Sequence, residues 1–175
     1  VTVKDVYGCT STVSQTISQP AALTVTPSNT NVSCYNGSNG TATATVSGGT
    51  GPYTYSWLPG GFSTSSINGL SIGTYTVNVT DAKGCKKTAT VTISQPPILA
   101  ISATTVDATC GKSNGSATVS GTGGFAPYTY LLNGAGQSTD TFTNLLPGDY
   151  LLIVTDVNGC QGSASFSVSS PTEIN

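Results

Sequence analysis

Polar and apolar residues alternate along residues 74–80, where Tyr75, Val77 and Val79 are separated by Thr and Asn. A period of two places apolar side chains on one face and polar side chains on the other, which predicts a half-buried β-strand. The segment Asp81-Ala82-Lys83-Gly84-Cys85 follows directly. An Asp side chain can cap a tight turn and Gly accepts a positive φ, so a hairpin is predicted here.

This strand and hairpin recur at nearly constant spacing. Asp5, Asp81 and Asp156 stand 76 and 75 residues apart, and the cysteine four positions after each Asp has the same spacing. A fixed period of this size indicates a tandem array, and we expect the chain to be a piece of a longer one. We divide it into the end of one repeat, two full repeats and the start of another, at residues 1–20, 21–96, 97–171 and 172–175.

Each full repeat has the pattern of an all-β unit. In the second unit, apolar or alternating segments bounded by Gly and Pro predict strands at 22–27, 31–34, 41–47, 53–58, 63–68, 74–80 and 86–93. Six or seven short strands with turns every 8 to 12 residues are typical of an immunoglobulin-like antiparallel β-sandwich. Trp57 is the predicted centre of its core. Tyr75 is expected at a corner, with its hydroxyl bonded back to the backbone.

Composition excludes several function classes. The chain has five Lys, no Arg, no His and seven acidic residues, with a net charge of −2. This balance argues against a nucleic-acid partner, because phosphate binding needs clustered cations. No apolar run reaches the length of a membrane-spanning helix. Without His or a second repeating carboxylate, a general acid and base are hard to assemble, so we predict that the protein is not an enzyme.

Calcium is the only cofactor with candidate ligands. Asp81 and Asp156 recur at the ends of the units, and calcium often joins extracellular β-domains through six to eight oxygen ligands. Each unit offers only one such Asp at an equivalent position. We therefore favour the interpretation that each Asp caps its own turn, and we expect no cofactor.

The cysteines fall into two classes. Loop cysteines, Cys34 and Cys110, precede the second strand, and hairpin cysteines, Cys9, Cys85 and Cys160, follow the penultimate strand. Cysteines at repeat spacing in a Thr-rich β-protein fit an oxidising, extracellular setting. One pairing joins the classes within each unit, as Cys34–Cys85 and Cys110–Cys160, with Cys9 bonded outside the chain. We favour it slightly because every unit could then fold by itself.

The alternative pairing joins neighbouring units. In a sandwich the two cysteine positions of one unit lie at opposite ends, separated by a strand of about eight residues, or ~26 Å. A disulfide requires Cα atoms within about 7 Å. Units stacked end to end would instead bring Cys34 near Cys160, and that bond would make the array a stiff rod.

One surface of the third unit is unexpectedly apolar. Leu131, Leu151 and Ile153 replace polar residues of the second unit on the outward face of two neighbouring predicted strands. Exposed apolar clusters often mark contacts, so we predict that these residues pack against another chain or a neighbouring unit. The alternative is a strand register shifted by one residue, which would place them in the core.

Several motifs together resemble the SprB-type repeat. They are Cys34 with Asn39-Gly40-Thr41-Ala42-Thr43, Gly48-Gly49-Thr50-Gly51-Pro52-Tyr53-Thr54-Tyr55-Ser56-Trp57, Gly73-Thr74-Tyr75-Thr76-Val77 and Val79-Thr80-Asp81-Ala82-Lys83-Gly84-Cys85. Such repeats form long arrays in secreted surface adhesins of gliding and related Bacteroidetes. The resemblance implies a very large cell-surface protein exported by a dedicated secretion system. We expect its partners to be other repeats of the same or neighbouring chains, with surface polysaccharide as an alternative partner.

The expected function is therefore a structural repeat array that gives a stiff stalk for adhesion or gliding motility. The alternative is a carbohydrate-binding β-sandwich module, with Tyr53, Tyr55 or Trp57 stacking on sugar rings. That alternative requires the three rings to point outward in a line. Leu131 and Leu132 replace Ser56 and Trp57 in the third unit, which weakens it.

Overall fold

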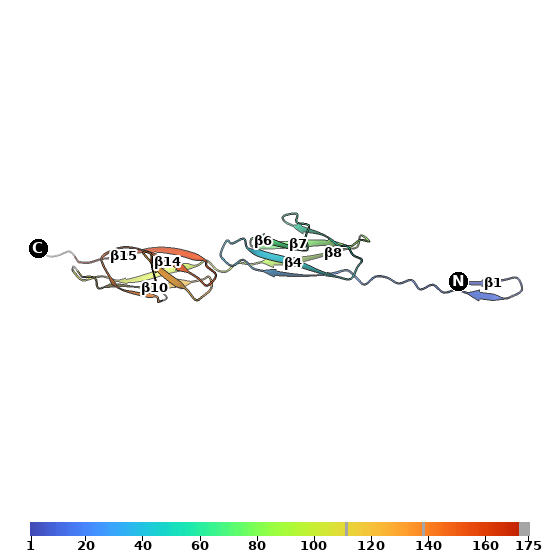
Figure 1. Ribbon diagram of the computed structural model, residues 1–175, viewed down its shortest axis with the longest axis horizontal. Helices are drawn as coiled ribbons and strands as arrows, with labels where there is room; N and C mark the ends of the chain where they lie inside the picture. The colour runs from blue at the N-terminus through green and yellow to red at the C-terminus, as the bar shows by residue number, and fades with distance from the viewer. Residues whose placement is uncertain (111, 138, 172–175) are drawn as a thin grey trace.

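The computed structural model describes residues 1–110, 112–137 and 139–171, and the expected start of a further repeat at 172–175 lies outside them. All regular elements of this part of the chain are β-strands. Figure 1 shows two sandwiches in a row, preceded by a hairpin at the N-terminal end. The strands of both sandwiches run roughly along the row.

The second unit is a sandwich of two three-stranded antiparallel sheets. One sheet has the order β3-β4-β6 and the other β5-β7-β8. The strands are β3 (Thr24–Thr30), β4 (Gly40–Ser47), β5 (Thr54–Leu58), β6 (Ser66–Leu70), β7 (Gly73–Thr80) and β8 (Lys86–Ile93). Pro27 lies within β3, which pairs only with β4, so its missing N–H leaves no ladder position unfilled.

The third unit repeats this arrangement and adds a strand. Its sheets have the orders β13-β10-β9 and β12-β11-β14-β15. The strands are β9 (Ala100–Val106), β10 (Gly115–Thr122), β11 (Thr129–Leu132), β12 (Ala135–Gln137), β13 (Thr141–Leu145), β14 (Gly148–Thr155) and β15 (Gln161–Val168). Asn133 and Gly134 both have positive φ, as a two-residue hairpin turn requires, and so lead into β12. In the second unit Pro59 follows β5 and cannot donate to such a ladder.

The N-terminal hairpin matches the last hairpin of each sandwich. Its strands are β1 (Thr2–Lys4) and β2 (Thr10–Thr12), in which Thr2 pairs with Thr12. In the second unit Asn78 pairs with Thr88 in the same register. All residues from 1 to 20 are exposed to solvent.

Each sandwich has a core of its own. The largest fully buried side chains are Trp57, Val77, Val79 and Ile93 in the second unit, and Val119, Leu152 and Val154 in the third. The predicted corner at Tyr75 is confirmed, and Tyr150 forms its counterpart in the third unit. The hydroxyl of Tyr75 donates to Ser71 O at 3.1 Å, and the hydroxyl of Tyr150 donates to Leu146 O at 2.8 Å.

The start of the second unit differs from the expectation. The chain forms one strand, β3, over part of the predicted 22–27 strand and beyond it, whereas residues 31–34 are in a loop. There the N–H of Val32 donates to Ser94 O, and the side chain of Asn31 accepts the N–H of Ser94. These bonds turn the chain away from β4 towards the end of β8, so the predicted strand at 31–34 was wrong.

Candidate functional site

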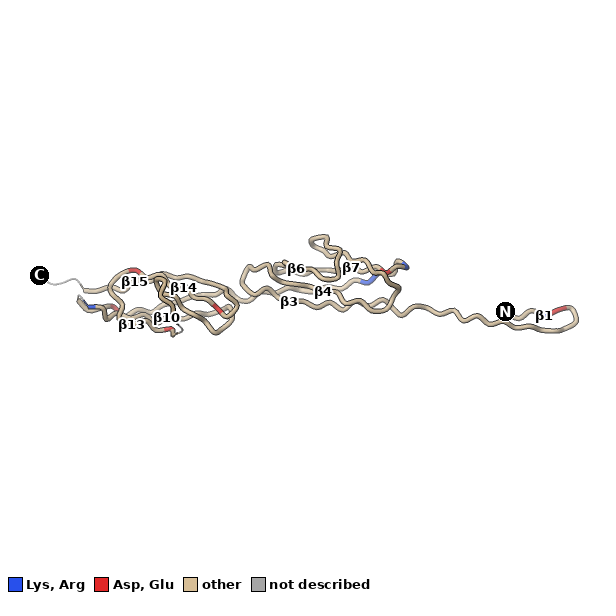
Figure 2. The backbone as a smooth tube through the Cα atoms, in the orientation of Figure 1, with Lys and Arg blue, Asp and Glu red and all other residues tan. Residues whose placement is uncertain are grey.

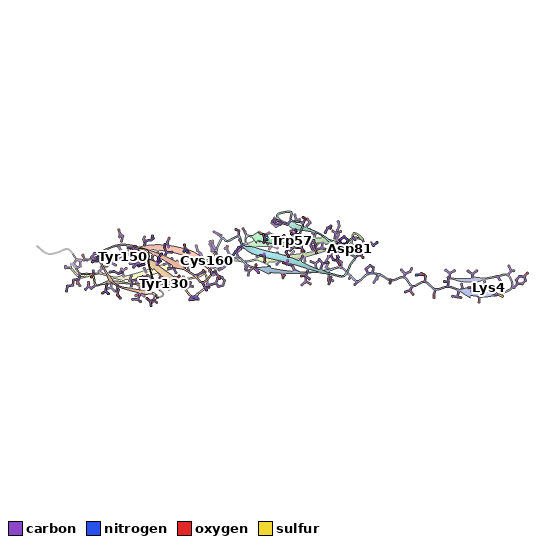
Figure 3. The ribbon with its side chains drawn as sticks, in the orientation of Figure 1. Lys4, Trp57, Asp81, Tyr130, Tyr150 and Cys160 are labelled. Carbon is purple, nitrogen blue, oxygen red and sulfur yellow. A yellow bond between two sulfur atoms is a disulfide. The ribbon has the colours of Figure 1, made fainter. Side chains whose placement is uncertain are left out.

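A disulfide bond joins the two sandwiches. It links Cys34, in the loop between β3 and β4, to Cys160, in the hairpin between β14 and β15. The two Cα atoms are 5.5 Å apart, although 126 residues separate the cysteines in sequence. Figure 3 shows Cys160 at the end of the third unit that faces the second unit. We call this bond the junction disulfide.

The favoured pairing within units is therefore corrected. Cys34–Cys85 and Cys110–Cys160 are not formed, and Cys9, Cys85 and Cys110 carry exposed free thiols. The physical reason is strand length, which also favoured the alternative pairing between neighbouring units. β7 spans eight residues and separates the loop cysteine of its unit from the hairpin cysteine by about 26 Å. Only a neighbouring unit can bring a second sulfur within bonding distance.

The loop that carries Cys34 is held by local hydrogen bonds. The side chain of Asn39 accepts the N–H of Ser33 at 3.0 Å and donates to Ser33 Oγ at 2.7 Å. Gln95 Oε1 accepts the N–H of Asn36 at 2.9 Å, which ties the loop to the end of the same unit. Sequence reasoning missed the role of Asn39, although the Asn-Gly dipeptide at 39–40 recurs at 114–115 and could have indicated it.

The hairpin that carries Cys160 is organised by a buried carboxylate. Oδ1 of Asp156 accepts the N–H groups of Asn158 and Cys160, each at 2.9 Å, and Oδ2 accepts the N–H of Phe125 at 2.9 Å. The carboxylate thus fixes the turn and ties it to the loop before β11. Burial of Asp156 is tolerated because both of its oxygens are hydrogen-bonded.

Asp81 makes the same three bonds in the second unit. Its carboxylate accepts the N–H groups of Lys83, Cys85 and Thr50 at 2.8 to 2.9 Å. The described residues contain no cluster of three or more Asp, Glu, His or Cys that could hold a metal ion. The hydrogen bonds accepted by Asp81 and Asp156 give both residues a structural role, which is to hold the turn. Figure 2 shows the charged residues gathered mainly at turns and ends, with few along the strands.

These bonds predict an acid-sensitive second unit. Burial acts to raise the pKa of the Asp81 carboxyl, but N–H donation from Thr50, Cys85 and Lys83 holds that pKa below its ordinary value of 3.8. A lowered pKa in the folded state stabilises the fold at higher pH, and the stabilisation is lost as the pH falls below 3.8 through the folded-state pKa.

We expect the melting temperature of the second unit to fall between pH 4 and pH 2, and to fall less in Asp81→Asn, which cannot titrate. Thermal unfolding followed by circular dichroism at several pH values measures both proteins. Equal pH dependence in the two would contradict the role given to this carboxylate.

The linker between the units packs closely against the third unit. A Cβ on Gly162 would lie 3.1 Å from Leu99 O and 3.0 Å from Ile101 Cδ1. Glycine fits this close approach, because a side chain at position 162 would need Leu99 or Ile101 to shift by a few tenths of an ångström. A hollow of about 430 Å³ remains beside the junction disulfide. Its lining includes Tyr35, Pro97 and Gly124.

The rings proposed as a sugar platform do not form one. Trp57 is 0% exposed, and its Nε1 donates to Thr64 O at 2.9 Å. Tyr53 and Tyr55 pack against the core, and the Tyr53 hydroxyl donates to Gly48 O at 2.7 Å. Figure 3 places Trp57 inside the second sandwich. The carbohydrate-binding hypothesis needed all three rings outward, and for Trp57 this was wrong.

The apolar residues of the third unit do lie on the outer face. Leu131 pairs with Ile153 across β11 and β14, while Leu152 and Val154 point into the core. Leu151 is 52% exposed, and the other two residues are partly exposed. The predicted strand register is therefore correct. The contact proposed for this face stays a prediction.

Comparisons with solved structures give low similarity. The amphioxus IgVJ-C2 molecule is 13% identical with a TM-score of 0.34, covering 69% of this chain and 90% of that one. The N-terminal eight Ig domains of Down Syndrome Cell Adhesion Molecule isoform 1.30.30 are 14% identical with a TM-score of 0.35, covering 85% of this chain and 25% of that one. At these values the likeness carries no functional information. A search of curated proteins gave no match.

A protein-family model does match both units. The model of the SprB repeat aligns with residues 24–62 and 102–137. The first range runs from β3 to just after β5, and the second runs from within β9 to the end of β12. The resemblance found in the sequence is confirmed, since each of the two sandwiches contains a segment that matches the SprB repeat.

Proposed function

We propose that this chain is a segment of a stiff extracellular stalk in a secreted surface adhesin, serving adhesion or gliding. The observation that carries the proposal is the junction disulfide, which connects consecutive repeats at a second point besides the peptide linker. A surface adhesin is the setting that the SprB repeat family supports. The family and the all-β fold point to a structural domain rather than an enzyme.

Two covalent connections at one junction restrict bending. A single peptide linker allows two domains to rotate about it, and relative motion is the default for domains joined in that way. Here the linker passes through Pro96 and Pro97, each of which fixes its own φ. The junction disulfide joins the units at a second point, so it restricts rotation of one unit against the other. A stalk needs this property to hold an adhesive end away from the cell.

The strand direction supports the same role. The strands run roughly along the row of units, and antiparallel ladder hydrogen bonds are perpendicular to their strands. A force along the row therefore shears the ladder bonds of β3 and β15, the two sandwich strands that lie outside the junction disulfide. Disulfides persist in oxidising environments, which supports an extracellular location. Within the described residues, no helix is long and apolar enough to cross a membrane.

Solution scattering tests the proposed stiffness. For the oxidised protein we expect an extended particle whose two units keep one relative orientation. In Cys34→Ser, which removes the junction disulfide, we expect a broader distribution of interatomic distances with a smaller mean, because the units bend about the linker. Cys85→Ser is the matched control, since it removes an exposed cysteine that forms no disulfide in this chain. Identical scattering from Cys34→Ser and the control would contradict the proposal.

A further inference from the structure

Two free cysteines, Cys110 and Cys85, lie in the same local structures as the bonded cysteines, Cys34 and Cys160. We propose that Cys110 and Cys85 are halves of further junction disulfides, Cys110 with the hairpin cysteine of the next repeat and Cys85 with the loop cysteine of the preceding one. Copies of this chain stacked head to tail would reproduce this bond. Cys110 of one copy would bond to Cys85 of the next. This inference rests on the proposed stalk, in which the internal junction is the template for contacts between copies.

The loop of Cys110 reproduces the loop of Cys34. The side chain of Asn114 accepts the N–H of Thr109 at 2.9 Å and donates to Thr109 Oγ1 at 2.9 Å, as Asn39 does with Ser33. The Cys110 sulfur lies 3.6 Å from Pro171 O. Pro171 occupies the position of Pro96, which lines the internal junction beside Cys34. Cys110 therefore has the same local surroundings at the outer end of the third unit as Cys34 has at the junction.

The hairpin of Cys85 reproduces the hairpin of Cys160. Asp81 fixes it through three N–H groups with the same geometry that Asp156 provides. The two hairpin cysteines differ in their partners, because Cys160 is bonded to a loop cysteine and Cys85 is a free thiol. If another unit stacked on the second unit as the second unit stacks on the third, its loop cysteine would lie beside Cys85.

Both ends are accessible to a second copy. Cys85 and Cys110 are exposed, and so are residues 1–20, which precede the second unit. Residues 13–20 belong to no strand and can be displaced by the incoming copy. Because the two surfaces are different and complementary, the contact is heterologous and continues as an open array rather than closing as a symmetric dimer.

The bond also needs an oxidant. A disulfide such as oxidised glutathione supplies it: the Cys85 thiolate attacks one glutathione sulfur and forms a mixed disulfide, releasing one reduced glutathione. The Cys110 thiolate of the other copy then attacks the Cys85 sulfur and releases a second. Two thiols are oxidised, one oxidised glutathione is reduced, and the two thiol protons leave with the products.

Like charges slow the approach of the two ends. Lys86 and Lys87 follow Cys85, where Gln161 and Gly162 follow Cys160, and Lys112 lies two residues after Cys110. Screening reduces this repulsion, since the Debye length falls to about 3 Å at 1 M salt. The coupling is therefore best measured at high salt.

Two complementary variants test the polarity of the contact. Cys9→Ser with Cys85→Ser leaves only Cys110 free, and Cys9→Ser with Cys110→Ser leaves only Cys85 free. Each variant is incubated with oxidised glutathione at 1 M salt, alone and as an equal mixture, and separated without reduction. We expect at least ten-fold more covalent dimer in the mixture than in either variant alone, with Cys85 joined to Cys110 in its peptide map.

If the free thiols of the two variants reacted at random, the mixed dimer would make up half of all dimers in the mixture. Homodimers as abundant as the mixed dimer, or no dimer at all, would therefore overturn the inference. Circular dichroism of each variant confirms that it is folded. The same peptide maps report Cys34–Cys160. If that bond is present and the mixed dimer is absent, only this inference fails. If that bond is absent, the proposed stalk fails with it.

Discussion

Replacement of Trp57 by alanine is expected to lower the free energy of unfolding of the second unit by about 3–5 kcal/mol. Trp57 is the largest fully buried side chain of that core, and its removal leaves a cavity and takes away the Nε1–H group from which Thr64 O accepts a hydrogen bond. A unit of about 75 residues has roughly 4–11 kcal/mol of stability in total. The variant should therefore lose a large part of the stability of its second unit.

Calorimetry can assign the loss to one unit. Leu132 occupies the equivalent position in the third unit, so Leu132→Ala is the matched control and should destabilise that unit instead. Each variant should shift one unfolding transition and leave the other nearly unchanged, because the two cores are separate. A loss below about 1 kcal/mol for Trp57→Ala would mean that the ring is not the centre of the core.

Reduction of the junction disulfide is expected to change how the chain responds to force. When the chain is pulled from its two ends, the oxidised protein carries the load from Cys34 directly to Cys160. The 126 residues of sequence separation are then excluded from extension. In the reduced protein these residues join the load path. They can contribute about 420–450 Å of additional contour length at 3.3–3.6 Å per residue.

Single-molecule pulling measures this difference directly. The reduced protein, or Cys34→Ser, should show two large unfolding steps, one for each sandwich. The oxidised protein should show neither, since only the chain outside the bond can extend. Cys110→Ser keeps the junction disulfide and should behave as the oxidised protein. Two large steps in the oxidised protein would show that force does not pass through the bond.

Much of the fold was predictable because its signals are local. The alternation along 74–80 and the Asp81–Cys85 turn specify β7 and its hairpin through side-chain period and turn chemistry alone. The loop at 31–34 was not predictable in the same way. Its course depends on bonds from Asn31 and Val32 to Ser94, which is more than sixty residues away in sequence.

The pairing of the cysteines required information that spacing does not contain. Cys34 and Cys85 belong to one folding unit, which favours their pairing, but the sandwich places them at opposite ends. The predicted strand length already argued against pairing within a unit. The pairing could be settled only by how one unit sits on the next, where Cys34 and Tyr35 of the second unit lie around the same hollow as Gly159 and Gln161 of the third.

A peptide map of the unreduced protein tests the central claim, that consecutive repeats are covalently joined, most directly. The free thiols are blocked, the chain is digested without reduction, and the linked peptides are identified by mass spectrometry. The account predicts a single linked pair that contains Cys34 and Cys160, with Cys9, Cys85 and Cys110 blocked as thiols. Linked peptides containing Cys34 with Cys85, or Cys110 with Cys160, would contradict it.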